Sequence, residues 1–176
     1  MTPLEDIIYE GGRQMGDIRF FDMTYEDVIR KYKQTVGAVC VMRLKNYADA
    51  EDCFQNTFFI LYRNAPHFES ETHLKAWLIR VAINECNKYI RKNKSFVSLE
   101  KTNADSVDFP ADNCDMSWAL SKLDSKYREV LYLFYAEDYE INEIADILQK
   151  SPNTIKTLLR RGRVKLRKMY GGDDNE

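Results

Sequence analysis

The chain has 176 residues, of which 44 % are hydrophobic and 31 % charged, with only seven glycines and four prolines. This composition indicates one medium or two small globular domains built from helices, and the chain lacks the run of about 18 apolar residues that a membrane span needs. The first residues carry acids and no basic segment followed by an apolar one, so a secretory signal is not expected. We therefore expect a cytoplasmic protein.

The net charge of −2 conceals an uneven distribution of charge along the sequence. Residues 20–94 carry 12 basic and nine acidic side chains, and residues 116–170 carry 11 and seven, whereas residues 95–115 carry one and five. Such blocks predict separate domains. We expect an N-terminal extension (1–19), a first domain (20–94), an acidic linker (95–115), a second domain (116–170) and an acidic tail (171–176).

Three long helices are predicted in the first domain. Apolar residues recur at three- and four-residue spacing over residues 24–45, 48–63 and about 72–94. Thr24 is a suitable N-cap for the first helix, and acids in the first turn of the second helix complement its positive N-terminus. Residues 64–71, which include a proline, are predicted to form a loop.

The second domain is predicted to contain four shorter helices. Residues 95–115 before it show no sustained periodicity and are rich in Ser, Asn and Asp, as is typical of a linker. The expected fold class is all-α, with two small helical domains joined by a flexible acidic linker. The four helices are expected at residues 116–123, 125–136, 141–149 and 152–170.

The last two of these helices have the features of a helix-turn-helix. Ser151 is placed to cap the final helix, and a proline follows at its first position. Seven cations and no acid lie among the thirteen residues from Lys156 to Lys168, which favours binding to phosphates. A solvated or partner-binding basic helix is the alternative. Gly162 costs this helix about 1 kcal/mol relative to alanine unless close packing requires it.

Two stretches of the chain resemble conserved regions of bacterial sigma factors. DAEDCFQNTFFILYRNAPHFESETHLKAWLIRVAINECNKYIRK resembles region two, and LDSKYREVLYLFYAEDYEINEIADILQKSPNTIKTLLRRGRVKLRK resembles region four. With only these two regions and a short acidic linker, the chain is similar to the extracytoplasmic-function sigma factors of the sigma-70 family over about residues 20–170. The resemblance implies an RNA polymerase initiation subunit that binds core polymerase and promoter DNA and has a probable anti-sigma partner.

The resemblance also assigns contact residues. The DAED-x-x-Q helix is implied to dock on core polymerase, the loop and helix after it to open and read the minus-ten element, and the final helix to bind the minus-thirty-five duplex. A surface for the polymerase flap is implied on the helix Tyr127–Phe134, although core packing would give the same apolar pattern. The implied residues are Asp49, Glu51, Asp52 and Gln55 for polymerase; Phe68, Arg80, Asn84, Lys88, Arg91 and Lys92 for the minus-ten element; and Asn153, Thr154, Lys156, Thr157, Arg160, Arg161 and Arg163 for the minus-thirty-five element.

Several of these assignments have simpler readings. The acids of the second helix also serve as N-terminal capping charges, and Phe68 is as suited to a core as to stacking on a base. The sequence also departs from the family pattern. LQKSPNTI replaces LGIS-x-x-TV, so that Gln149 stands where the turn commonly has glycine, and Asn56 stands where an acid is more usual.

Other functions receive less support. A stand-alone helix-turn-helix regulator that binds operators as a dimer is the main alternative, and an RNA-binding protein has only the basic helix in its favour. We find no catalytic motif, and we expect no cofactor and no metal. The four cysteines form no CxxC pair, and reduced thiols are expected rather than a disulfide or zinc site; they are Cys40, Cys53, Cys86 and Cys114.

Overall fold

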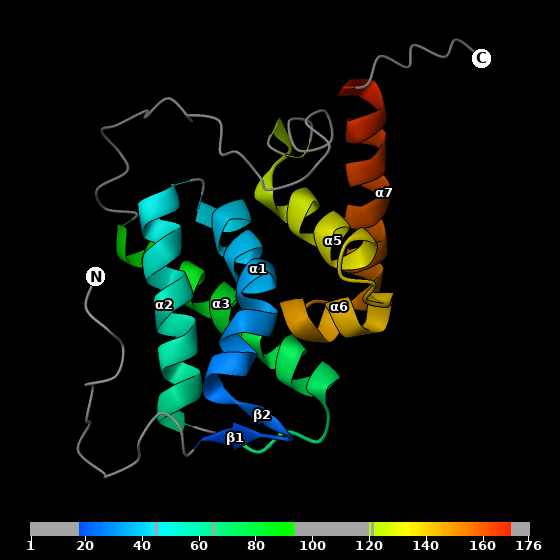
Figure 1. Ribbon diagram of the computed structural model, residues 1–176. Coiled ribbons are helices and arrows are strands. Elements are labelled where there is room, and N and C mark those ends of the chain that lie inside the picture. The colour runs from blue at the N-terminus through cyan, green and yellow to red at the C-terminus, as the bar shows by residue number, and fades with distance from the viewer. Residues whose placement is uncertain (1–17, 45, 65, 94–119, 121, 170–176) are drawn as a thin grey trace.

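The computed structural model describes residues 18–44, 46–64, 66–93, 120 and 122–169. Residues 1–17, the whole predicted linker, the tail and the start of the helix expected at 116–123 lie outside these ranges. The other six predicted helices are present to within one residue at each end. The first domain consists of α1 (Tyr25–Leu44), α2 (Tyr47–Asn64) and α3 (Glu71–Asn93), and the second of α5 (Ser125–Tyr135), α6 (Ile141–Leu148) and α7 (Pro152–Met169), as Figure 1 shows.

A small antiparallel hairpin precedes α1 and adds one feature to the all-α prediction. It consists of β1 (Arg19–Phe20) and β2 (Met23–Thr24), with Phe20 opposite Met23. Two-residue strands are too short to show the alternation by which a strand is recognised in sequence. Phe21, in the turn, has a φ of 60° and is 45 % exposed.

The helix starts follow from local hydrogen bonds. The Thr24 hydroxyl accepts a bond from the Asp27 backbone N–H (3.2 Å), while the Asp27 carboxylate accepts one from the Thr24 N–H (3.1 Å). This reciprocal pair confirms Thr24 as the N-cap of α1. Asn46 caps the start of α2, since its side-chain oxygen accepts a bond from the Ala48 N–H at 3.0 Å.

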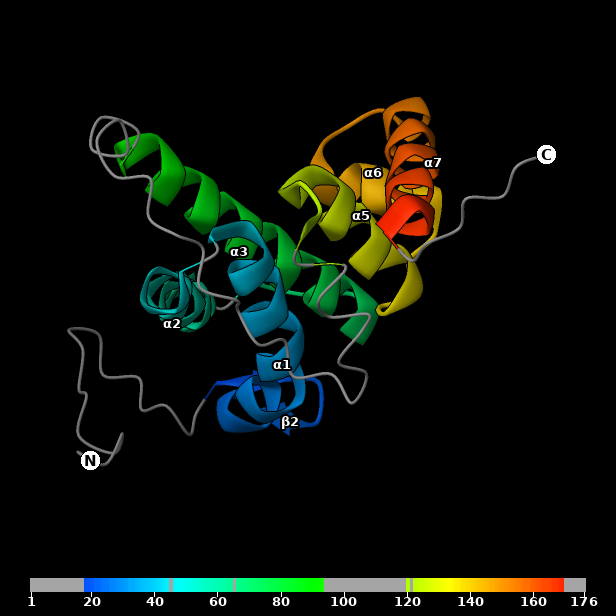
Figure 2. The same ribbon diagram turned by 90° about the horizontal axis from the view of Figure 1, so that it is seen from above.

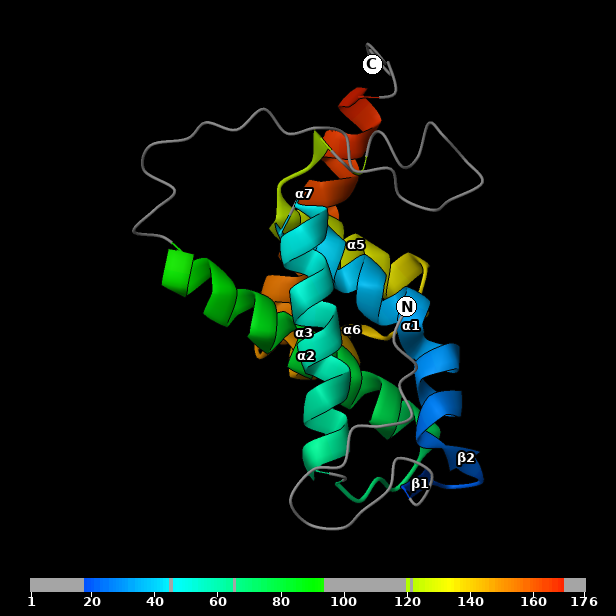
Figure 3. The ribbon, with the colours of Figure 1, turned by 60° about the vertical axis from the view of Figure 1, so that its left-hand side comes forward.

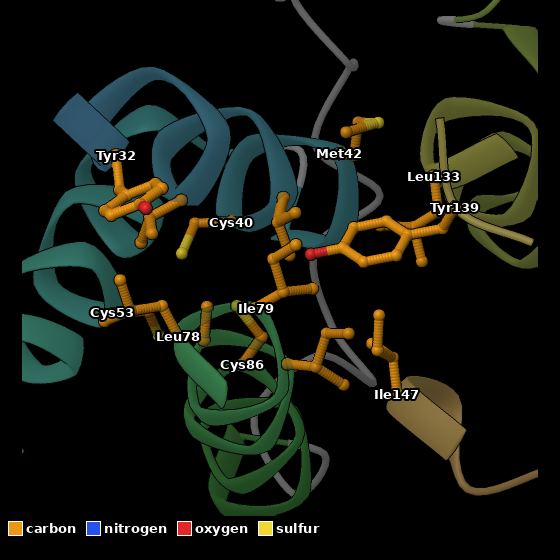
Figure 4. Packing of buried hydrophobic residues seen from close by; sticks show 14 of the residues in the cluster. Tyr32, Cys40, Met42, Cys53, Leu78, Ile79, Cys86, Leu133, Tyr139 and Ile147 are labelled. Carbon is orange, nitrogen blue, oxygen red and sulfur yellow. The ribbon is translucent and has the colours of Figure 1, made fainter. Parts of the chain in front are cut away.

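The core of the first domain lies where α1, α2 and α3 meet. Fully buried aliphatic side chains from each helix fill it, including Val36, Leu61 and Leu78. Cys40, Cys53 and Cys86 contribute one buried free thiol from each helix, as Figure 4 shows. Burial raises the pKa of the Cys53 thiol to about 12, so these cysteines act as small apolar side chains.

The turn of the helix-turn-helix is closed without glycine. Gln149 adopts the left-handed conformation itself (φ 53°, ψ 48°), and the Lys150 N–H donates to the Ala145 carbonyl at 2.9 Å. This bond is characteristic of a Schellman motif. Ser151 caps α7 as predicted, because its hydroxyl accepts a bond from the Thr154 N–H at 3.2 Å.

Close packing of α7 on α5 explains Gly162. A Cβ atom at this position would lie 3.0 Å from Leu131 Cδ1 and 3.4 Å from Tyr127 Cβ. Glycine therefore lets the two helices approach, which offsets its cost to the helix.

The two domains pack against each other rather than standing apart. In Figures 1 and 3, α5 lies beside α1 and α6 lies beside α3, and Figure 2 shows α5, α6 and α7 together on one side of α3, with α1 and α2 on the other. The buried apolar side chains form one continuous cluster across both domains, and Figure 4 shows Tyr139 of the second domain pointing toward the helices of the first. No helix in the described part of the chain is long and apolar enough to cross a membrane.

Candidate polymerase and DNA interfaces

The final helix presents the residues predicted for the minus-thirty-five duplex on one open side. Ile155 and Leu159 are buried and anchor α7 to the rest of the domain. The opposite side is solvent-exposed and basic, with short polar side chains at its start. All seven predicted residues lie on exposed positions of α7: Asn153, Thr154, Lys156, Thr157, Arg160, Arg161 and Arg163.

One of the seven, Arg163, also contacts another helix of its domain. The Arg163 guanidinium lies 5.7 Å from the ring centres of both Phe134 and Tyr135 on α5. Lys165, two residues further on, pairs with Asp124 at 3.2 Å. The two cations are therefore oriented by the start and end of α5. Arg163 and Lys165 thus contact the start and end of α5, whereas Lys156, Arg160 and Arg161 lie on the exposed side of α7.

The residues predicted for the minus-ten element divide into two groups. Asn84, Lys88, Arg91 and Lys92 are exposed on the second half of α3 and form a polar, mainly basic face. Arg80 is only partly exposed, and one of its terminal nitrogens donates a 2.8 Å hydrogen bond to the Asp146 carbonyl in the second domain. This bond directs the Arg80 guanidinium toward the second domain.

Phe68 lies in the aromatic core at the base of the first domain. It is 5 % exposed, and its ring centre is 5.8 Å from Phe20 and 5.5 Å from both His73 and Trp77. Of its two readings, this arrangement favours packing. Contact with a base stays a prediction, and it would require the loop to move away from the hairpin.

The acids predicted to meet the polymerase are also not equivalent. Glu51, Asp52 and Gln55 are exposed on α2. Asp49 is half-buried, and its carboxylate accepts a 2.5 Å hydrogen bond from the Tyr89 hydroxyl of α3. This bond is the main reason that the pKa of Tyr89 is raised to about 12. Asp49 therefore links α2 to α3 in this conformation.

A groove beside Glu51 was not predicted. It lies between α1 and α2, has a volume of about 270 Å³, and is lined on both sides by apolar and polar side chains. Its one sequence signal is an aromatic residue at the start of a helix, Tyr47, which is 71 % exposed. The lining residues are Lys33, Gln34, Gly37, Val41, Tyr47, Ala50, Glu51 and Phe54.

Two family models match the chain, one on each domain. Sigma-70 region 2 matches residues 28–96, and sigma-70 region 4 matches residues 119–166. The ECF RNA polymerase sigma factor SigW of Bacillus subtilis is 31 % identical over 164 residues, which cover 82 % of this chain and 87 % of SigW. The ECF RNA polymerase sigma factor SigM of the same organism is 29 % identical, over 88 % of this chain and 99 % of SigM.

Solved structures agree with these matches. The sigma factor RpoE of Bartonella quintana, solved with the anti-sigma factor NepR, aligns with a TM-score of 0.72 and 25 % identity, over 85 % of this chain and 98 % of that one. CnrH, solved with the cytosolic domain of CnrY, shares the fold with a TM-score of 0.58 and 20 % identity, over 85 % and 89 % of the two chains. The chain therefore belongs to the extracytoplasmic-function sigma factors of the sigma-70 family, which direct promoter-specific initiation by RNA polymerase.

Proposed function

We propose that the first domain docks on core polymerase through α2 and binds the minus-ten element through α3, while α7 of the second domain binds the minus-thirty-five duplex. The observation that carries this proposal is the presence of two exposed basic faces on two family domains. One face follows the second half of α3, and the other follows α7. The place of action that we propose is the cytoplasm.

The geometry of α7 supports binding in the major groove of a duplex. A recognition helix contacts base edges with residues in its first turns and phosphates with longer cations beyond them. Asn153, Thr154 and Thr157 occupy the first turns, and Arg160 and Arg161 follow. The turn at Gln149 and the cap at Ser151 set the angle between α6 and α7, and so the angle at which α7 would enter the groove.

The exposed face of α3 suits a strand that has left the duplex. Exposed cations bind the backbone of a displaced strand, and an exposed amide such as Asn84 can both donate to and accept from a base edge. Lys88, one turn after Asn84 on α3, pairs with Glu85 of the same helix. Arg91 and Lys92 extend the face toward the end of α3.

The outer face of α2 supports docking on a basic partner. Glu51, Asp52 and Gln55 are exposed on α2, and Glu51 also lines the groove between α1 and α2, where Tyr47 and Phe54 supply apolar contact area. An apolar centre with polar side chains at its edge, here Lys33, Gln34 and Glu51, is a common arrangement in protein interfaces. An anti-sigma factor is the further partner that we propose, since the similar sigma factors RpoE and CnrH were solved with NepR and with CnrY.

This division of contacts fits a chain whose net charge is −2. When one large partner holds both domains, the second DNA contact forms at a high effective concentration, so that each domain alone needs only weak affinity. A stand-alone dimeric regulator has no polymerase to raise the effective concentration of its second DNA contact, and it therefore needs nanomolar affinity for a palindromic site.

A gel-shift experiment on promoter fragments, with and without bacterial core polymerase, tests the proposal. We expect weak, salt-sensitive binding by the chain alone and a specific complex when core polymerase is added. Arg160→Ala should weaken the complex with a fragment that carries the minus-thirty-five element. Lys88→Ala should weaken the complex with a fragment whose minus-ten element is already opened. Tight binding to a palindrome without polymerase, unchanged by its addition, would establish the regulator instead.

A further inference from the structure

The turn of the β1–β2 hairpin holds a bulky aromatic residue in a conformation that suits glycine. Phe21 and Asp22 form the turn, and Phe21, the first of the two, has a φ of 60°. Two-residue hairpin turns need a positive φ at this position, which glycine adopts without a steric cost. Asp138 and Gln149, the other non-glycine residues with a positive φ in the described ranges, are polar. A large apolar residue with this backbone is an outlier that indicates a role for the side chain itself.

The ring of Phe21 is exposed, whereas the ring of its neighbour is buried. Phe20 is 5 % exposed and Phe21 is 45 % exposed. Phe20 and Ile18 are buried in the first domain, and the Tyr25 N–H donates to the Ile18 carbonyl at 3.1 Å. These contacts hold the hairpin in place and leave the ring of Phe21 at the surface.

The hairpin lies beside the loop that we propose to read the minus-ten element, as Figures 1 and 3 show. The rings of Phe20 and Phe68 join the two segments, with their centres 5.8 Å apart. Phe68, the loop residue predicted to contact a base, is buried by Phe20 and by Trp77 of α3. The exposed ring at this junction is instead that of Phe21, the next residue of the hairpin.

We propose that Phe21 stacks on a base of the displaced minus-ten strand, so that the hairpin is a further part of the minus-ten site. Proteins that bind single strands combine cations for the backbone with aromatic rings on which bases stack. The proposed cations lie on α3, whereas the exposed charges next to Phe21, those of Arg19 and Asp22, have opposite signs. A ring contact is therefore what the hairpin can add. The inference rests on the proposed function, because it takes the loop and α3 as the minus-ten site.

The backbone conformation of Phe21 allows this role to be separated from a structural one. Glycine at this position suits the turn and has no ring, so Phe21→Gly should keep the hairpin and lose the stacked base. A ring that served only the fold would behave in the opposite way. Its removal would lower the stability of the chain and leave the affinity for an opened strand unchanged.

The test uses the full chain assembled with bacterial core polymerase, and a promoter fragment whose minus-ten element is already opened. Fluorescence anisotropy measures the affinities for core polymerase and for this fragment, and a fluorescent adenine analogue at successive positions of the displaced strand reports on stacking. Phe21→Gly removes the ring and Phe21→Tyr retains it. Phe59→Ala is the matched control, because Phe59 is 39 % exposed and lies within α2. Urea unfolding of the free chain measures stability.

We expect Phe21→Gly to weaken binding of the opened fragment by about fivefold or more, the loss that one stacked base entails. The fluorescence change of the analogue should disappear at one position of the strand, and the urea midpoint should not fall. Phe21→Tyr should retain the affinity and the fluorescence change, and Phe59→Ala should alter neither.

Unchanged affinity of Phe21→Gly for the opened fragment would overturn the inference, as would an equal loss with Phe59→Ala or a loss accompanied by a lower urea midpoint. Weaker binding of Phe21→Gly to core polymerase, with unchanged fluorescence along the strand, would identify a protein contact and would also overturn it. Failure of the wild-type complex to bind the opened fragment would instead refute the proposed function.

Discussion

Replacing Gln149 with glycine should stabilise the helix-turn-helix. An L-residue in the left-handed conformation costs about 1–2 kcal/mol relative to glycine, and Gln149 is in this conformation at φ 53°. Glycine also has more conformational freedom in the unfolded chain, which lowers the free energy of unfolding by about 0.4–1 kcal/mol. The balance is a gain of about 0.5–1 kcal/mol for Gln149→Gly, in a turn whose Schellman bond at Lys150 is already in place.

Lys150→Gly is the matched control, because Lys150 follows Gln149 directly but does not have a positive φ. It should lower stability by up to about 1 kcal/mol, since it adds unfolded-state freedom and relieves no strain. Urea unfolding gives the free energies, and hydrogen exchange of α6 and α7 shows whether the change is local. Equal destabilisation by both variants would refute the idea that Gln149 is strained in a turn suited to glycine.

Three further outcomes follow from particular contacts. Arg160→Ala should weaken duplex binding by the free chain and reduce the slope of log affinity against log salt by about one unit, as measured by anisotropy titrations at several salt concentrations; an unchanged slope would show that Arg160 contacts no phosphate. Tyr89→Phe should cost about 0.5–1.5 kcal/mol in urea unfolding, because it removes the bond to Asp49, and no loss would mean that water replaces that bond at no cost. Leu78→Ala should cost about 2–5 kcal/mol, because Leu78 is fully buried, and a loss below 1 kcal/mol would contradict the core described.

The helices could be predicted from sequence because each has its own periodicity and local end signals. Thr24 and Ser151 cap the helices that their positions indicate, and both bonds are present. The helix-turn-helix was also predictable without the usual glycine, since the spacing of buried residues around Gln149 is preserved. The hairpin that contains Phe21 was missed because its strands have two residues each.

The remaining differences come from contacts between distant residues. Arg43 and Glu129 are 86 positions apart, and neither lies in a motif that indicates a partner. Asp49 matches the polymerase motif as well as Glu51 does, and only the position of Tyr89 on α3 distinguishes them. Phe68 is equally suited by sequence to a core or to a base, and its contact with Phe20 depends on the unpredicted hairpin.

Run-off transcription with bacterial core polymerase on a set of genomic templates tests the central claim most directly. The account predicts transcripts that start at a defined set of promoters only when this chain is added, and that are reduced by Arg160→Ala together with Arg161→Ala. These residues are exposed on α7 and have no role in its core. The absence of promoter-specific transcripts across the template set, with the chain folded and core polymerase active, would contradict the account.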